Sequence, residues 1–197
     1  MSRVIIGITG SIGAGKDTVG ILLRDKLGGA IKLSFKAALV QKIVRVFEVD
    51  PTLFYDRDAK DKPTPLLFGH TPRYVMQTLG TDWARNLISP DIWSEYVRRQ
   101  ILILPSDVVI TDVRFDNEAR MVKEEGGVVW EIVRRNNPYA AVSGVDHEAE
   151  KGIDKTLIDA TILNNGNCLK QLEQEVVREL SKLKRSRADH AIEKRQF

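Results

Sequence analysis

The segment that most constrains this chain is a glycine-rich loop that joins an apolar run to an amphipathic stretch. Residues 4–8 are apolar and mostly β-branched without alternation, which is typical of a strand buried on both faces of a parallel sheet. The loop that follows reads Gly10-Ser11-Ile12-Gly13-Ala14-Gly15-Lys16. Apolar residues at helical spacing then run from Lys16 to Leu27 and stop at Gly28-Gly29. A strand, a glycine loop and a helix in this order predict a phosphate-binding loop for a nucleoside triphosphate.

Each part of this P-loop suits an anionic ligand. Glycines let successive backbone N–H groups point at phosphate oxygens, and the helix N-terminus adds its positive end. Lys16 supplies a charge to the β- and γ-phosphates. Asp17 stands where Ser or Thr is usual, and two interpretations stay open: it binds Mg²⁺ directly or through water, or it caps the helix and leaves Thr18 to the phosphates. The predicted ATP contacts of the loop are Ser11, Gly13, Ala14, Gly15, Lys16, Asp17 and Thr18.

The rest of the chain alternates strands with helices. We expect strands at 30–35, 108–111, 128–133 and 160–164, helices at 36–47, 73–87, 91–104, 117–125 and 169–183, and a loop-rich stretch at 50–72. This order predicts an α/β fold: a doubly wound parallel five-stranded sheet whose ligands lie at the carboxyl ends of its strands. We expect one domain over 1–197, with a core of about 1–35, 106–133 and 158–184, a helical section at about 36–105, and a charged tail at 185–197 that is frayed helix or disordered.

A second pair of charged groups follows the predicted strand at 108–111. Asp112 ends this apolar run, where P-loop enzymes carry a carboxylate associated with Mg²⁺. Arg114 follows on the same rim and would clamp an anionic acceptor or the transferring phosphoryl group, unless it pairs locally with Asp116 or Glu118. We predict that Asp17 and Asp112 are the carboxylates of a Mg²⁺ site.

The composition narrows the class of partner. A formal charge of +3 and a pI of about 9.0 suit anionic metabolites without requiring nucleic acid. The single cysteine, Cys168, excludes an intrachain disulfide and is expected to be a small buried residue. No apolar run reaches the roughly 20 residues that a membrane span needs, so we expect a cytoplasmic protein. We predict small-molecule nucleotides as partners, with no nucleic acid and no membrane, and leave a homodimer open.

Three segments together resemble the deoxynucleoside monophosphate kinases of the tailed-phage type. They are Gly15-Lys16-Asp17-Thr18, Asp112-Val113-Arg114-Phe115-Asp116-Asn117-Glu118 and His147-Glu148-Ala149-Glu150, with further similarity at 79–83 and 164–166. The family's loop also reads Gly-Lys-Asp-Thr, so Asp17 agrees with it, whereas Ala149 stands where Ser is more familiar. The resemblance implies a P-loop core, an acceptor-binding helical section, a lid at about 134–157, and transfer of the γ-phosphoryl group of ATP to a dNMP, giving dNDP and ADP.

Side chains of the helical section would bind the acceptor. Arg73 and Gln77 lie one helical turn apart, so the guanidinium can hold the phosphate while the amide meets a base edge. Trp83 and Trp93 are expected to be core residues, with stacking on a base as the alternative. The predicted acceptor-binding residues are Phe35, Lys36, Arg73, Gln77, Thr81, Arg85, Trp93 and Glu150.

Two further loops follow predicted strands. Arg134 and Arg135 open a polar loop after 128–133, which suits arginines that reach the phosphates on closure. Asn164, Asn165 and Gly166 would form a turn beside the adenine, although Asn-Gly is also an ordinary turn pair. The predicted catalytic residues are Lys16, Asp112, Arg114, Arg134 and Arg135.

Other functions of a P-loop chain stay open at this point. A kinase that acts on an alcohol such as dephospho-coenzyme A would use Asp112 as a base, and a binding-only protein would hold ATP without transfer. A GTPase switch is disfavoured, because no Asn in the chain is followed by Lys, as the guanine-binding motif Asn-Lys-x-Asp requires.

Overall fold

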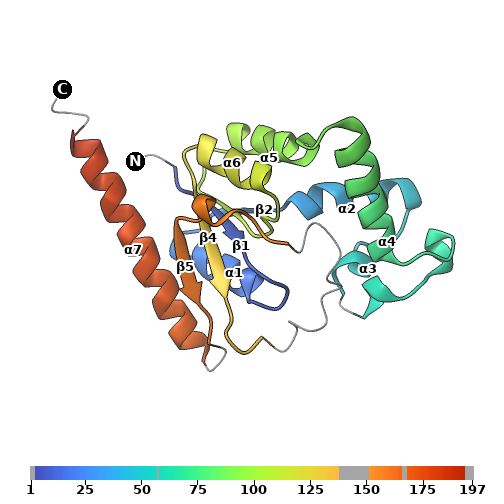
Figure 1. Cartoon of the computed structure of the whole chain (residues 1–197), viewed down its shortest axis with the longest axis horizontal. Helices are drawn as coiled ribbons and strands as arrows, with labels where there is room; N and C mark the ends of the chain where they lie inside the picture. The colour runs from blue at the N-terminus through green and yellow to red at the C-terminus, as the bar shows by residue number, and fades with distance from the viewer. Residues whose placement is uncertain (1–2, 57, 138–150, 166–167, 194–197) are drawn as a thin grey trace. The chain divides into compact units, whose positions relative to one another are not determined.

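The computed structural model describes residues 3–56, 58–137, 151–165 and 168–193. The chain divides into two compact units, one of Met1–Lys32 with Ser106–Phe197 and one of Leu33–Pro105. The second unit is therefore an insertion into the first. Each unit is described by itself below (Figure 1).

The first unit is built on a five-stranded sheet. Its strands are β1 (Ile5–Thr9), β2 (Ile31–Leu33), β3 (Val108–Ile110), β4 (Val128–Val133) and β5 (Ala160–Leu163), in the spatial order β2-β3-β1-β4-β5. The pairs β1–β3, β1–β4 and β4–β5 are parallel, with Ile6 opposite both Val109 and Val128. Because β1 is central, all five of its residues are buried. The predicted α/β fold with a parallel five-stranded sheet is confirmed.

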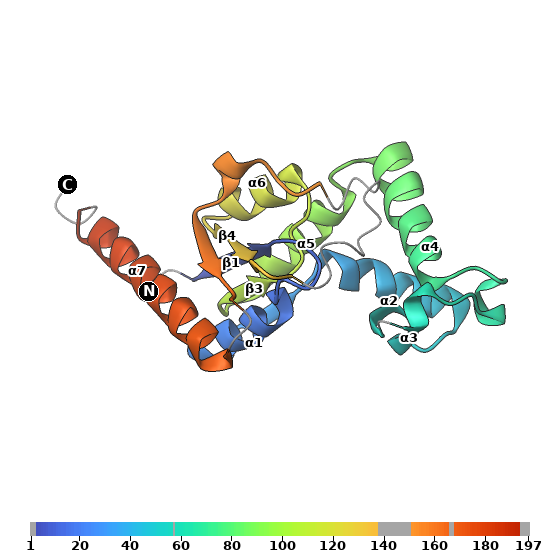
Figure 2. The same ribbon diagram turned by 60° about the horizontal axis from the view of Figure 1, so that its bottom comes forward.

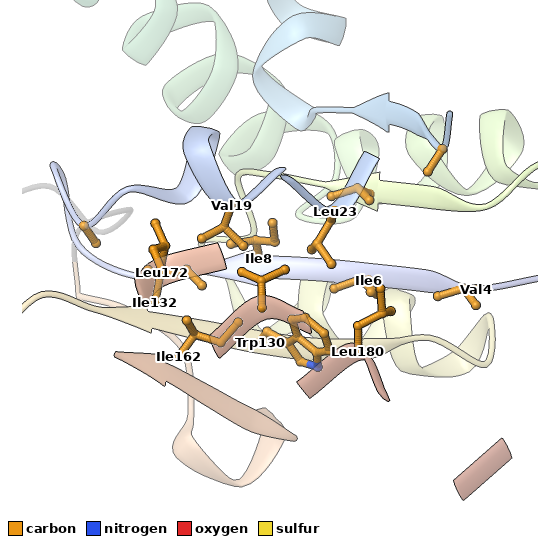
Figure 3. Packing of buried hydrophobic residues seen from close by; sticks show 14 residues of the cluster. Val4, Ile6, Ile8, Val19, Leu23, Trp130, Ile132, Ile162, Leu172 and Leu180 are labelled. Atoms are coloured by element: carbon orange, nitrogen blue, oxygen red, sulfur yellow. The ribbon is translucent and has the colours of Figure 1, made fainter. Parts of the chain in front are cut away.

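Helices α1 (Lys16–Lys26) and α7 (Leu169–Glu193) pack on one face of this sheet. Figure 3 shows the core that they enclose: Ile6 and Ile8 from β1 and Trp130 from β4 meet Leu23 of α1 and Leu180 of α7. Large apolar side chains at every second strand position fill this layer, as expected for a sheet covered by helices.

Helix α6 (Asp116–Glu124) covers β1 and β4 on the opposite face, as Figure 2 shows with α6 and α1 on either side of the strands. The approach is close at Gly7, where an added Cβ would lie 3.0 Å from Cγ2 of Val113 and 3.2 Å from Cγ2 of Val122. The sheet therefore has helices on both faces, and loops at its carboxyl edge are left to bind ligands.

Helix α7 is longer than predicted. The expected end was residue 183, but the helix continues to Glu193, so residues 185–193 of the expected tail are regular helix. Arg187 fixes this extension, since its Nη1 donates to the carbonyl of Arg3 at 2.7 Å and its Nη2 to that of Gly126 at 2.8 Å. Cys168, just before α7, is exposed, so the expectation of a buried thiol is wrong.

The second unit is helical. Its elements are α2 (Phe35–Phe47), α3 (Thr52–Tyr55), the 3₁₀ turns η1 (Ala59–Asp61) and η2 (Pro65–Leu67), α4 (Pro72–Gln77), the π-helix η3 (Thr78–Ile88) and α5 (Ile92–Ile103). Its core includes Val40 and Ile43 of α2, Phe54 of α3, Leu67 and Val75. The predicted loop at 50–72 thus contains three short helical turns. The strand expected to end at residue 35 stops at Leu33, because Ser34 caps α2 by accepting from the N–H of Ala37.

The segment predicted as one α-helix at 73–87 is α4 followed by the π-helix η3. The N–H of Ser89 bonds to the carbonyl of Ala84, five residues back. Gly80 lies inside this segment, where a Cβ would come within 2.6 Å of Cδ2 of Leu39. Within the described residues, no helix has both the length and the apolar character to cross a membrane.

Candidate functional site

The loop after β1 has backbone angles that favour its three glycines. Gly10, Gly13 and Gly15 have φ of 136°, 76° and 101°, the left-handed region that glycine tolerates best. Side chains are also excluded by contact, since a Cβ on Gly10 would lie 2.4 Å from the carbonyl oxygen of Ile132. All three glycines are therefore favoured by the backbone conformation, and Gly10 is also required by the close approach of β4.

Lys16 opens α1 and folds back over this loop. Its Nζ donates to the carbonyl oxygen of Gly10 at 2.7 Å and to that of Ser11 at 2.9 Å. These two bonds keep the positive charge of Lys16 at the loop that is predicted to bind phosphates.

The next three carbonyls of the loop also accept from side chains. Asn137 Nδ2 donates to Ile12 O at 2.6 Å, Arg134 Nη1 to Gly13 O at 3.3 Å, and Asn164 Nδ2 to Ala14 O at 2.8 Å. With the two bonds of Lys16, the carbonyls of residues 10–14 are all bonded to side-chain donors. The carbonyl side of the loop is thus satisfied by the protein, which favours presentation of its N–H side to an anion.

The two arginines after β4 differ in their surroundings. Arg134 is partly buried beside the loop, and its Nε is buried without a hydrogen-bond partner among the described residues. Arg135 is exposed. A buried guanidinium nitrogen at a phosphate loop is suited to an incoming anion, because leaving it unpaired is energetically costly.

Asp17 does not cap α1. The N-cap is Gly15, without a side-chain cap bond, while Asp17 Oδ1 accepts from Lys32 Nζ of β2 at 2.8 Å. The side chain of Asp17 is 81% exposed and that of Lys32 is 40% exposed. Of the two interpretations of Asp17, capping is excluded by this arrangement, and a carboxylate open to solvent and cations remains. Thr18 is exposed as well.

Asp112 follows β3 at the carboxyl edge of the sheet, as predicted, and is partly buried. The backbone N–H groups of Arg114 and Phe115 donate to Oε2 of Glu118 at 2.8 and 3.2 Å. Glu118 is 3% exposed and lies in the first turn of α6, where a carboxylate also meets the positive helix end. Glu118 thus holds the backbone of Arg114 rather than leaving this segment mobile.

Asn165 lies at the end of β5 beside a cavity of about 360 Å³. The cavity is lined by Leu163, Asn164, Asn165, Cys168, Gln171, Leu172, Gln174, Glu175 and Arg178. Several amides that both donate and accept hydrogen bonds line one hollow next to the phosphate loop.

In the second unit, Arg73 is already paired with a carboxylate. Its Nε lies 2.5 Å from Oδ1 of Asp61 and its Nη2 lies 3.0 Å from Oδ2, a bidentate arrangement. The hydrogen bond from Arg73 lowers the pKa of Asp61 below its usual value. Arg73 and Gln77 both lie in α4, one turn apart as predicted, whereas Thr81 and Arg85 lie in the π-helix η3.

The other predicted acceptor residues of this unit differ in their exposure and in their hydrogen-bond partners. Lys36 Nζ donates to the carbonyl of Phe54 at 2.6 Å and lies 4.7 Å from the ring centre of Tyr55. Phe35 is 5% exposed and belongs to the core, so little of its side chain is open to a ligand in this conformation. Trp93 is held by its indole N–H on the carbonyl of Gly80 at 2.9 Å, whereas Trp83, expected in the core, is 50% exposed.

The family model for deoxynucleotide monophosphate kinase matches residues 69–176, more than half of the 197-residue chain. The chain belongs to this family. The matched region includes the segment around Asp112 and Arg114 and most residues that line the cavity beside β5, and it begins after the phosphate loop. The loop is therefore separate support for a nucleotide-binding kinase.

Two relatives of this kinase agree. A protein of Acanthamoeba polyphaga mimivirus, whose name assigns it provisionally to the deoxynucleotide monophosphate kinases, is 34% identical over 144 residues, 66% of this chain and 74% of its own. The deoxynucleoside-5′-monophosphate kinase of Escherichia phage T5 is 30% identical over 112 residues, which are 54% of this chain and 44% of the phage protein.

A solved structure supports the fold. The shikimate kinase of Bacteroides thetaiotaomicron matches with a TM-score of 0.52 at 14% identity, over 93% of this kinase and 99% of its own chain. At this identity the match shows the architecture alone.

Some predicted residues of the kinase cannot be placed. Glu150 and Gly166 lie outside the described residues, as do His147 and residues 138–150 of the expected lid. The predicted sites omit Lys32, which bonds to Asp17, and Asn137, which bonds to the carbonyl of Ile12. Asn164 is predicted only as part of a turn beside the adenine, whereas its amide donates to the carbonyl of Ala14. The atom that each of these side chains meets depends on the folded backbone.

Proposed function

We propose that this kinase transfers the γ-phosphoryl group of ATP to a deoxynucleoside monophosphate, giving dNDP and ADP. The observation that carries the proposal is the phosphate loop, whose carbonyls from Gly10 to Ala14 are bonded to side chains, with the guanidinium of Arg134 beside it. Membership of the deoxynucleotide monophosphate kinase family supplies the acceptor class.

The donor site belongs to the first unit. Residues 11–18 would hold the triphosphate, with Lys16 at the β- and γ-phosphates and Asn165 and Gly166 beside the adenine. Arg134 would stabilise charge on the transferring group, and Arg114, held by Glu118, would orient an anionic oxygen. Arg135 would contribute less, because it is exposed in this conformation.

The proposed phosphoryl transfer does not require a strong general base. The acceptor phosphate is already anionic near neutral pH, so catalysis rests on alignment and on neutralising charge. Asp112 is then a carboxylate that orients a cation rather than one that removes a proton. This assignment separates the proposal from a kinase that phosphorylates an alcohol.

Acceptor binding is assigned to the second unit, through Lys36, Arg73, Gln77, Thr81, Arg85 and Trp93, while Glu150, also predicted for the acceptor, lies outside the described residues. Lys36 and Arg73 are the cations best suited to a phosphate. Arg73 would have to exchange Asp61 for the acceptor, and Lys36 would have to release the carbonyl of Phe54. Phe35 would act by supporting Lys36 from the core.

A Mg²⁺ ion fits the donor set of the first unit. Asp17 and Asp112 offer the hard oxygen ligands that Mg²⁺ prefers, and within the described residues no cluster of three or more His, Cys, Asp or Glu side chains could form an all-protein cage. This pattern suits Mg²⁺ held by one or two carboxylates together with substrate phosphates. Such an ion would neutralise charge on the β- and γ-phosphates. The modest formal charge of +3 supports free nucleotides as partners rather than nucleic acid.

An acceptor panel tests the proposal. Purified protein with ATP and Mg²⁺ is offered dTMP, dGMP, dCMP, dAMP and dephospho-coenzyme A in separate reactions, and ADP and the phosphorylated acceptor are both quantified. ADP and dNDP formed in equal amounts with at least one dNMP support the proposal, and Lys16→Ala should abolish that product. Turnover of dephospho-coenzyme A alone, or ATP binding without turnover of any acceptor, contradicts it.

A further inference from the structure

Two peptide planes of the phosphate loop are fixed by asparagine side chains from other segments. Asn137, in the loop after β4, donates to the carbonyl of Ile12 at 2.6 Å, and Asn164, after β5, donates to that of Ala14 at 2.8 Å. Each bond must run from the amide NH₂, because a carbonyl oxygen only accepts. Both acceptors immediately precede a glycine in the left-handed region, Gly13 and Gly15.

The carbonyl and the following N–H of a trans peptide point in opposite directions. A donor that holds the Ile12 carbonyl therefore also sets the direction of the Gly13 N–H, and one that holds the Ala14 carbonyl sets that of the Gly15 N–H. The peptide between these two is bound differently, since the N–H of Ala14 donates to Ser11 O at 3.2 Å within the loop. The asparagines thus control the two N–H groups on either side of that turn.

Glycine makes this control useful. Gly13 and Gly15 permit the loop's conformation, but residues without a Cβ also have the widest range of alternative backbone angles. Asn164 is itself held, because its backbone N–H donates to the carbonyl of Val133 at 2.8 Å. It also fills the space beside Gly15, where a Cβ would lie 2.5 Å from its Nδ2. Asn164 therefore links the loop to the sheet edge: its backbone is bonded to β4 and its side-chain amide to the loop.

We propose that Asn137 and Asn164 are positioning residues that pre-set the Gly13 and Gly15 N–H groups for the phosphates of the donor nucleotide. The inference rests on the proposed function, because it takes the loop to be the triphosphate site. It assigns these side chains to the phosphates through the backbone rather than to the adenine. Pre-set donors bind an anion more tightly, since less ordering is needed on binding.

Variants with a matched control test this assignment. Asn137→Ala and Asn164→Ala each remove one donor, and Asn136→Ala removes the same type of side chain from the neighbouring exposed position. Calorimetric titrations measure Kd for inorganic tripolyphosphate and for ATP, both with Mg²⁺, and thermal melts confirm folding. We expect Asn137→Ala and Asn164→Ala to weaken both ligands by a similar factor, about fivefold each, and Asn136→Ala to change neither. In Asn137→Ala and Asn164→Ala the KM for ATP should rise, while the KM for the dNMP stays constant.

The outcomes separate the possibilities. If either variant binds tripolyphosphate as tightly as the unmodified protein, or loses affinity for ATP only, the positioning role is wrong for that residue. If the unmodified protein binds neither ligand, the donor site and this inference both fail. If it binds both but phosphorylates no dNMP, the proposed function fails while a fivefold loss in the variants still supports the inference.

A measurement on the unmodified protein tests the proposal even if the variants do not fold. In ¹⁵N-resolved NMR spectra, the amide protons of Gly13 and Gly15 should move downfield when tripolyphosphate and Mg²⁺ are added, as expected for new hydrogen bonds to phosphate oxygens. The amide of Gly126, in a turn remote from the loop, provides the reference. Unchanged positions for Gly13 and Gly15 at saturation overturn the proposal.

Discussion

The ammonium nitrogen of Lys32 lies 2.8 Å from Oδ1 of Asp17, so a cation of the protein already occupies one oxygen of the carboxylate proposed for Mg²⁺. Both side chains are substantially exposed, and such a pair contributes little to folding. Its effect should appear in metal binding instead, because Lys32 and Mg²⁺ would compete for the carboxylate of Asp17.

Removing this competitor should lower the metal requirement. We expect Lys32→Ala to reduce the Mg²⁺ concentration for half-maximal activity by about twofold to fivefold, as the pair is worth at most about 1 kcal/mol. Asp17→Asn should raise it. Activity measured against free Mg²⁺ at saturating ATP checks this, and direct binding of Mn²⁺ gives a second reading. A higher Mg²⁺ requirement in Lys32→Ala would instead show that Lys32 assists the phosphates.

The adjacent arginines after β4 should differ in effect. Arg134 reaches the carbonyl of Gly13, whereas Arg135 is exposed. We expect Arg134→Ala to lower kcat about 100-fold or more and Arg135→Ala to lower it less than about tenfold, given the usual value of a donor to transition-state charge. Steady-state kinetics at saturating ATP and dNMP provide the comparison, and equal losses would contradict the distinction.

Gly20 of α1 should tolerate a methyl group only when Thr111 is shortened. A Cβ at Gly20 would lie 2.5 Å from Cγ2 of Thr111, and the next atoms are Cβ of Thr111 at 3.8 Å and Cδ1 of Ile8 at 4.0 Å. Gly20→Ala alone should destabilise the fold by about 1–3 kcal/mol through overpacking. In a Thr111→Ser background, which lacks Cγ2, the same change should be neutral or stabilising by up to about 1 kcal/mol, because Ala is the better helix former.

A double-mutant cycle of urea unfolding measures this coupling. The free energies of unfolding of the parent, both single variants and the double variant are needed. A Gly20→Ala penalty that stays the same in the Thr111→Ser background would place the clash elsewhere.

The pair of Arg73 and Asp61 should give an acid-dependent term in stability. The pKa of Asp61 is lowered from its ordinary 3.8 by the hydrogen bond from Arg73. A carboxyl whose folded pKa is depressed adds stability above its unfolded pKa, and that stability is lost as pH falls through the folded value. The difference in unfolding free energy between the parent and Asp61→Asn should therefore be constant above about pH 5 and should shrink below about pH 3.8. With both side chains well exposed, we expect a small difference, about 0.5 kcal/mol. A difference that grows toward low pH would contradict the assignment.

The sheet and the loop could be predicted because their signals are local. The short, mainly apolar segments predicted at 4–8, 108–111 and 128–133 correspond to the strands Ile5–Thr9, Val108–Ile110 and Val128–Val133. The glycine spacing after β1 identifies the loop for the same reason, since the positive φ angles are needed within a few residues.

What the sequence could not predict depends on contacts between distant segments. The π-helix at Thr78–Ile88 has the apolar spacing of an α-helix, so the sequence does not distinguish the two. Its contacts are with distant residues: Gly80 lies close to Leu39, and the carbonyl of Gly80 accepts from the indole N–H of Trp93. The extension of α7 is set by Arg187 on two remote carbonyls, where the charged sequence alone suggested fraying.

The support of the phosphate loop is another such case. An asparagine in a polar loop is ordinarily a turn residue, so Asn137 and Asn164 give no sign in the sequence of the peptides that they bind. Lys32 likewise resembles any lysine of an edge strand. The contacts of all three side chains depend on where the folded backbone places them.

The nested order of the chain has a consequence for synthesis on the ribosome. The phosphate loop is complete after residue 18, but Asn164, which holds its Ala14 carbonyl, is added about 150 residues later. At roughly 5–20 residues per second, the nascent loop would wait on the order of 10 s for that support, while the inserted helical unit is made first. A chain released early would carry the nucleotide motif without the amide that organises it, so truncated products should bind ATP more weakly than the full-length enzyme.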